Sequence, residues 1–192
     1  STGKEIKVRP FTVKEEKLLL TAIETKDTNE IINSVKQVIN NCIVSGDFNV
    51  NKTPFYDVDF LFIFLRAKSM GESVKVNLTC KNVVDDHECG NVFKSDMNIS
   101  KCVMEHDKTI SKDIEISKLT GVTMKYPTYD VVKRMEGNSA IDIKASLIAS
   151  SIDTIYNDKG IYKSSDYTFE QLKEFVEGLT EEKFRELERF VD

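Results

Sequence analysis

The sequence predicts an α+β fold in which a small antiparallel β insert separates two helical blocks. Apolar residues recur at helical spacing near both ends of the chain and alternate with polar residues in the middle. Because the strands are segregated from the helices, a parallel sheet of βαβ units is not expected. We place a helical block at 1–70, the β insert at 71–126 and a second helical block at 127–192, with the two helical blocks in one domain.

The composition is that of a globular protein. The chain has 192 residues, of which 40% are hydrophobic and 31% are charged, and its net charge is −5. No basic stripe is visible, so sequence-independent binding to nucleic acid is not expected. The longest dense apolar run, Phe60–Leu65, is far shorter than the roughly 20 residues that cross a membrane. No signal-peptide pattern opens the sequence, so we expect a cytoplasmic protein with cysteines that are free or on a metal.

Three helices are expected in the first block. The run Thr12-Val-Lys-Glu15 is a capping box, which begins a helix that ends near Thr25. Pro54 suits the first position of a third helix, and the apolar run that follows predicts a central core helix. The second helix is indicated by residues that share one helical face: Ile31, Ile32, Val35, Val38, Ile39, Cys42 and Ile43.

The middle of the chain has the period of strands. Val74, Val76 and Leu78 alternate with polar residues and predict a strand that ends at Cys80. A returning strand is expected over 92–99. Further alternation predicts strands around 114–116 and 122–126, so we expect one small sheet built from hairpins.

Helices are expected again from Pro127. A short one covers 127–135, and a longer one takes its apolar face from Ala140 to Ile155. A turn follows at 157–160. A second capping box, Thr168-Phe-Glu-Gln171, opens the next helix, and Thr180 caps the last one.

The stretch TCKNVVDDHECG, from Thr79 to Gly90, raises the question of a metal site. Cys80 and Cys89 are separated by eight residues, whereas zinc-binding pairs usually stand two to four residues apart. Cys102 and His106 have a C-x3-H spacing and could complete a structural zinc site, with His87 as another candidate ligand. The alternative is a hairpin with two partly buried thiols. A redox pair is not expected because no C-x-x-C is present, and Cys42 is assigned to core packing.

Other chemistry is poorly supported. Asp85, Asp86 and Glu88 lack the pattern of a calcium loop and are interpreted as a solvated loop. Asp57 and Asp59 could form a carboxylate pair, but the preference for acids at a helix start explains Asp57. No nucleotide-binding, zinc-protease or hydrolase motif is present, and the chain has only two histidines. We therefore expect no enzymatic activity and no cofactor other than structural zinc.

The last helix suggests a contact surface. Its apolar face either docks onto the body of the protein or binds a helix of a partner. The latter hypothesis names four residues near the end of the chain: Phe184, Leu187, Phe190 and Val191.

Three segments resemble the baseplate hub assembly proteins of T-even-type contractile-tailed bacteriophages. They are STGKEIKVRPFTVKEEKLLLTAIET, VKQVINNC and the hairpin VKVNLTC…ECGNV, and the most telling run is Arg9-Pro-Phe-Thr-Val-Lys-Glu-Glu-Lys17. The resemblance implies non-catalytic, chaperone-like assembly of the tail baseplate hub in the host cytoplasm, with other hub or tape-measure proteins as partners and with oligomers as an option. The alternatives are a permanent component of the virion hub and, from another class, a zinc-stabilised nucleic-acid-binding or regulatory module.

Overall fold

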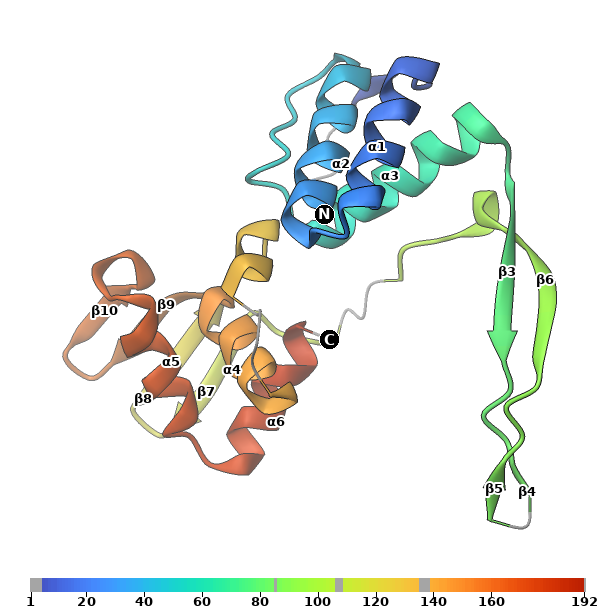
Figure 1. Cartoon of the computed structure of the whole chain (residues 1–192). Helices are drawn as coiled ribbons and strands as arrows, with labels where there is room; N and C mark the ends of the chain where they lie inside the picture. Colours follow the sequence, from blue (N-terminus) through green and yellow to red (C-terminus); the bar gives the residue numbers. More distant parts are fainter. Residues whose placement is uncertain (1–4, 85, 106–108, 135–138, 192) are drawn as a thin grey trace. The chain divides into compact units, whose positions relative to one another are not determined.

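The computed structural model describes residues 5–84, 86–105, 109–134 and 139–191. These residues form two compact units, which are drawn in Figure 1. Unit 1 takes its residues from 1–50 and 56–104, and unit 2 takes its residues from 51–55 and 105–192. Helices and antiparallel strands occur in both units, so the predicted α+β class is confirmed.

Unit 1 begins with a short strand and two helices. Strand β1 (Lys7–Val8) pairs with β2 (Ile43–Ser45) around the helices α1 (Val13–Thr25) and α2 (Thr28–Cys42), which pack together. Helix α1 ends where Lys26 adopts a left-handed backbone conformation with φ of 58°. The carboxylate of Asp27 then caps α2 by accepting hydrogen bonds from the N–H groups of Asn29 and Glu30.

The third helix, α3 (Phe55–Met70), is less buried than the sequence suggested. Its buried side chains are Val58, Leu65 and Ala67. Val58 and Leu65 are seven residues apart and share one face, whereas Ala67 lies on the opposite side of the helix. Phe60 and Phe64 retain 37% and 43% of their surface. The predicted central core helix is therefore only partly buried, because two phenylalanines of its apolar run remain exposed.

A long hairpin follows α3 in the chain. Strands β3 (Ser73–Thr79) and β6 (Val92–Asn98) form a two-stranded antiparallel sheet. The shorter strands β4 (Val83–Val84) and β5 (His87–Glu88) pair at its tip, and the one-turn 3-10 helix η1 (Ile99–Lys101) follows β6. The predicted strand and returning strand are both confirmed.

Unit 2 is a sheet covered by helices. Its strands β7 (Asp113–Ser117), β8 (Thr120–Met124), β9 (Ile152–Asn157) and β10 (Gly160–Lys163) form an antiparallel sheet in the order β10-β9-β8-β7. The helices are α4 (Ala140–Ser151), α5 (Phe169–Glu177) and α6 (Glu181–Val191), with 3-10 turns η2 (Tyr129–Arg134) and η3 (Ser164–Asp166).

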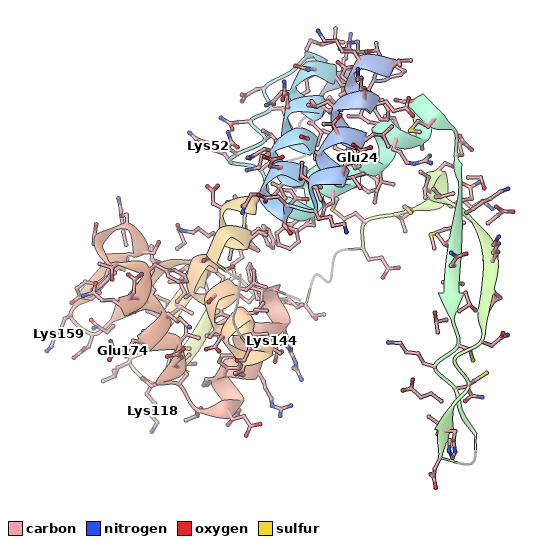
Figure 2. The ribbon with its side chains drawn as sticks, viewed as in Figure 1. Glu24, Lys52, Lys118, Lys144, Lys159 and Glu174 are labelled. Atoms are coloured by element: carbon pink, nitrogen blue, oxygen red, sulfur yellow. The ribbon has the colours of Figure 1, made fainter. Side chains whose placement is uncertain are left out.

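The core of unit 2 lies between one face of the sheet and these helices. Ile114 pairs with Val122, and Val122 with Ile155, so the three side chains share that face. Charged side chains such as Lys118, Lys159 and Glu174 lie on the outside of the unit (Figure 2). The buried core consists of Ile114, Val122, Met124, Ala145, Ile148, Ala149, Ile152, Leu172, Val176, Leu187, Phe190 and Val191.

Three expectations for the chain after Gly71 are corrected. The strands at 74–98 and 113–124 do not form one sheet, because β7 and β8 belong to the sheet of unit 2, in which β8 pairs with β9. The helix expected over 140–155 ends at Ser151, and Ile155 belongs to β9. Residues 152–157 include β-branched residues that pair with β8, and this long-range pairing outweighs the helical spacing of their apolar positions. The short helix expected at 127–135 is the 3-10 turn η2, and Met135 lies outside the described residues.

Candidate partner-binding surface

Three of the four residues predicted to bind a partner lie in the core of unit 2, and the fourth packs against it. Leu187 is fully buried, Phe190 and Val191 keep less than a tenth of their surface, and Phe184 packs against the same cluster. The ring of Phe190 stacks on that of Tyr126, with centroids 5.1 Å apart and planes 8° from parallel. These side chains pack within their own unit, as in the docking alternative for the last helix.

The predicted zinc ligands are brought together only in part. The N–H of Cys80 donates to the carbonyl of Asn91, and the N–H of Cys89 donates to that of Asn82, each over 2.8 Å. The two cysteines therefore occupy nearby rungs of the β3–β6 hairpin, with Cys80 half-buried and Cys89 exposed.

The zinc hypothesis stays a prediction, because the structure does not describe all of the remaining candidate ligands. Cys102 is exposed and follows η1, whereas His106 lies outside the described residues. Among the residues that the structure describes, no group of three or more cysteine, histidine or acidic side chains could hold a metal ion. His87 lies in β5, and Asp85 is not among the described residues.

The segment that resembles the phage proteins contains the most strongly shifted acid that the structure describes. Arg9 forms a bidentate ion pair with Glu15, in which Nη2 donates to Oε1 over 2.6 Å and Nη1 donates to Oε2 over 3.1 Å. The guanidinium, helped by hydrogen bonds from Thr12, lowers the pKa of Glu15 to about 2. Arg9 also donates to the carbonyl of Asn41 at the end of α2. This pair fixes the start of α1 against α2, which is a structural role.

The β3–β6 hairpin has one apolar and one polar face. In antiparallel strands, directly paired residues lie on the same face. The pairs Val74↔Met97, Val76↔Ser95 and Leu78↔Phe93 therefore form the apolar face, whereas Lys75↔Asp96, Asn77↔Lys94 and Thr79↔Val92 form the other. We call this two-stranded sheet the ribbon and its first set of residues the apolar face.

The apolar face is not buried within unit 1. Leu78, Phe93 and Met97 keep 40%, 49% and 47% of their surface, and Val74 and Val76 are half-buried. Figure 1 shows β3 and β6 as a two-stranded ribbon, and Figure 2 shows side chains on both of its faces. A hairpin of this kind is only marginally stable in water on its own, because three strands or a covering layer are normally required. The ribbon is therefore the best candidate for a surface that another protein covers.

The sequence contained part of this signal. The alternation of Val74, Val76 and Leu78 predicted a strand with one apolar side, and we assigned that side to a larger sheet. Phe93 and Met97 on the returning strand were not singled out. Their spacing of four residues places them on the same side of a strand, and this period could have identified them.

In the described ranges, no helix combines the length and the hydropathy needed to cross a bilayer.

The comparisons with known proteins agree with the resemblance. A family model described as T4 bacteriophage base plate protein matches residues 1–192. No curated protein and no solved structure matches the chain. The match to the family model extends over the whole length, so it includes both units and the ribbon. The chain therefore belongs to the T4 bacteriophage base plate protein family.

Proposed function

We propose that this base plate protein is a non-enzymatic, chaperone-like factor for assembly of the tail baseplate hub, and that it acts through the apolar face of the ribbon. The observation that supports the proposal is the exposure of Leu78, Phe93 and Met97 on a two-stranded sheet. Isolated apolar residues on a protein surface are ordinary, whereas a continuous apolar face usually marks an interaction site. In a base plate protein, the fitting occupant is another protein of the baseplate, such as a hub or tape-measure protein.

Two properties favour binding over catalysis. The pKa of Glu15, the most strongly shifted acid among the described residues, is explained by a structural ion pair that caps a helix. The net charge of −5 also gives no support to a nucleic-acid-binding module, which would need a positive surface to meet phosphates.

Adjacent residues on opposite faces of β3 provide a matched test. Leu78→Asp places a charge on the apolar face, and Thr79→Asp places the same charge on the polar face one residue later. In infected cells that contain only the variant protein, we expect Leu78→Asp to lower the yield of complete baseplates about tenfold or more, since burying an unpaired charge at an interface costs several kcal/mol. Thr79→Asp should retain the normal yield. Circular dichroism checks that both variants are folded, and equal yields for the two would contradict the proposal.

The assembly role is separated from a permanent structural role by where the protein is found. We expect mass spectrometry to detect the protein in lysates of infected cells and at far below one copy per hub in purified baseplates. A stoichiometric amount in finished baseplates would reject the assembly factor and establish a permanent hub component instead.

A further inference from the structure

The outer edge of β6 has backbone groups that point away from the ribbon. The N–H of Ile99 donates to the carbonyl of Glu72, and that of Cys80 donates to the carbonyl of Asn91, each over 2.8 Å. Both pairs continue the register of β3 and β6. Because inward and outward backbone groups alternate along an antiparallel strand, Phe93, Ser95 and Met97 bond to β3. The N–H and C=O groups that point outward belong to the intervening residues Val92, Lys94, Asp96 and Asn98.

This edge is open in the part of the chain that the structure describes, where β6 pairs with β3 and with no second strand. Proteins commonly protect an open edge with charged side chains, and Lys94 and Asp96 could serve that purpose alone. The two charges have opposite signs, however, and they stand symmetrically on either side of Ser95. An edge with this order of charges is complementary to its own sequence read in the opposite direction.

We propose that two copies of the chain pair through this edge, with their β6 strands antiparallel and Ser95 facing Ser95 on a two-fold axis. In this register Lys94 of each copy lies opposite Asp96 of the other, and the outward N–H and C=O groups of these residues form the hydrogen bonds. Phe93 lies opposite Met97 in the non-hydrogen-bonded pairs, where side chains approach most closely. The contact uses the same surface on both copies, as a two-fold dimer requires.

Other registers fit less well. Moving the axis to Lys94 or to Asp96 places like charges opposite each other on the axis, which is unfavourable. Moving the strands by one residue brings inward-pointing groups opposite outward-pointing ones, so the hydrogen bonds are lost. On the outer edge of β3, an axis at Val76 would place Lys75 opposite Asn77, without any charge complementarity. Among these arrangements, two β6 strands that pair about Ser95 are the most complementary.

The dimer would stabilise the ribbon. Two ribbons joined edge to edge form a four-stranded sheet, which is more stable than an isolated hairpin. The apolar faces of the two copies lie on one side of that sheet and form a larger surface. This inference extends the proposed function but does not depend on it, since the dimer forms without any other phage protein.

The test is the association of the purified full-length chain, measured by sedimentation equilibrium over a range of concentrations. We expect a reversible dimer. Lys94→Asp places acids opposite each other across the axis, so it should weaken the dimer about tenfold or more. Within its own ribbon Lys94 lies opposite Asn77, so the substitution breaks no directly opposed charge pair inside the ribbon. Lys81→Asp makes the same charge change away from β6 and should leave the dimer unchanged.

A mixing experiment separates charge pairing from general damage. The double variant Lys75→Asp/Asp96→Lys keeps opposite charges facing each other inside the ribbon, where residues 75 and 96 pair. It reverses the charge on the edge, so alone it should also be monomeric. Mixed with Lys94→Asp, it should form a heterodimer with nearly the affinity of the unmodified dimer. A chain that stays monomeric at all concentrations, a Lys94→Asp variant that dimerises normally, or a failure of the mixed variants to pair would each overturn the proposal.

Discussion

Leu78 and Phe93 lie directly opposite each other on the ribbon and remain substantially exposed, at 40% and 49% of their surface. Tyr126 and Phe190 form the contrasting pair, since their rings stack at 5.1 Å and Phe190 is buried. Both pairs join apolar side chains across neighbouring elements. Burial is what separates an internal contact, which stabilises the fold, from a surface that is available to another protein.

Truncation of Phe190 and truncation of Phe93 should lower stability by very different amounts. Phe190→Ala removes a ring from the core of unit 2 and should lower its free energy of unfolding by about 3–5 kcal/mol. Phe93→Ala removes an exposed ring and should change the free energy of unfolding by less than about 1 kcal/mol. Urea unfolding followed by circular dichroism measures both. A Phe190→Ala protein as stable as the unmodified chain would show that this ring is not part of the core.

Gly121 should accept a side chain only at a cost in stability. It pairs with Tyr156 across β8 and β9, and an added methyl group would overlap the ring and the hydroxyl oxygen of Tyr156. We expect Gly121→Ala to lower the free energy of unfolding by about 1–3 kcal/mol, because the tyrosine ring must move. Gly178→Ala is the matched control, since its methyl group would meet carbonyl oxygens at ordinary distances of 3.4 and 3.5 Å. Equal thermal melting temperatures for the two variants would be incompatible with this packing.

Glu15 should give unit 1 a characteristic acid sensitivity. Its pKa is lowered from 4.5 to about 2 in the folded chain, mainly by the hydrogen bond from Arg9. A carboxylate with a lowered pKa stabilises the fold above its unfolded pKa, and this stabilisation is lost as the pH falls towards its folded pKa. Glu15→Gln should therefore cost about 1.5–3 kcal/mol at pH 7.

The pH dependence of that difference is the decisive part of the measurement. Between pH 5 and pH 2 the free energies of unfolding of the Glu15→Gln variant and the unmodified chain should converge, because the unmodified Glu15 becomes protonated. Urea titrations at several pH values follow this convergence. A gap that stays constant down to pH 3 would mean that the ion pair with Arg9 does not stabilise unit 1.

The cysteines should differ in their reactivity towards a thiol reagent. Cys89 and Cys102 are exposed and should react rapidly in the folded protein. Cys42 is fully buried, and burial raises the pKa of its thiol, so it should react only after unfolding. Peptide mapping after timed alkylation assigns each rate, and rapid labelling of Cys42 would contradict its place in the core.

The same experiment tests the zinc hypothesis. If Cys80, Cys89, Cys102 and His106 bind zinc, added Zn²⁺ should protect the three cysteines together, and elemental analysis should find close to one metal per chain. Labelling rates that do not change with Zn²⁺, together with less than about 0.2 metal per chain, would reject the site.

Local signals in the sequence were sufficient for much of the fold. The capping boxes at Thr12 and Thr168 and the alternation after Val74 each depend on residues close in the chain, and all three correctly located an element. Strand β9 was missed because its pairing partner, β8, lies about thirty residues earlier in the sequence. A run such as 152–157 fits a helical face until that pairing is known.

The sequence left the role of the last helix open for a related reason. The amphipathic pattern of Phe184 to Val191 shows that one face of a helix is buried, but it does not show against what. In the structure that face closes the core of its own unit. For the ribbon, the alternation of apolar and polar residues also did not predict burial, because whether such a strand is covered depends on elements elsewhere in the chain. Only the structure shows that β3 and β6 form a two-stranded sheet whose apolar face is exposed.

Site-specific photo-crosslinking on β3 tests the central claim most directly. A photoreactive benzoyl-phenylalanine replaces Leu78 in one variant and Thr79, on the opposite face, in another. After irradiation of infected cells during tail assembly, mass spectrometry identifies the proteins joined to each position. We predict an adduct between position 78 and another baseplate protein, and none from position 79. Equal labelling from both positions, or no baseplate protein joined to position 78, would contradict the proposal that the apolar face of the ribbon binds the partner.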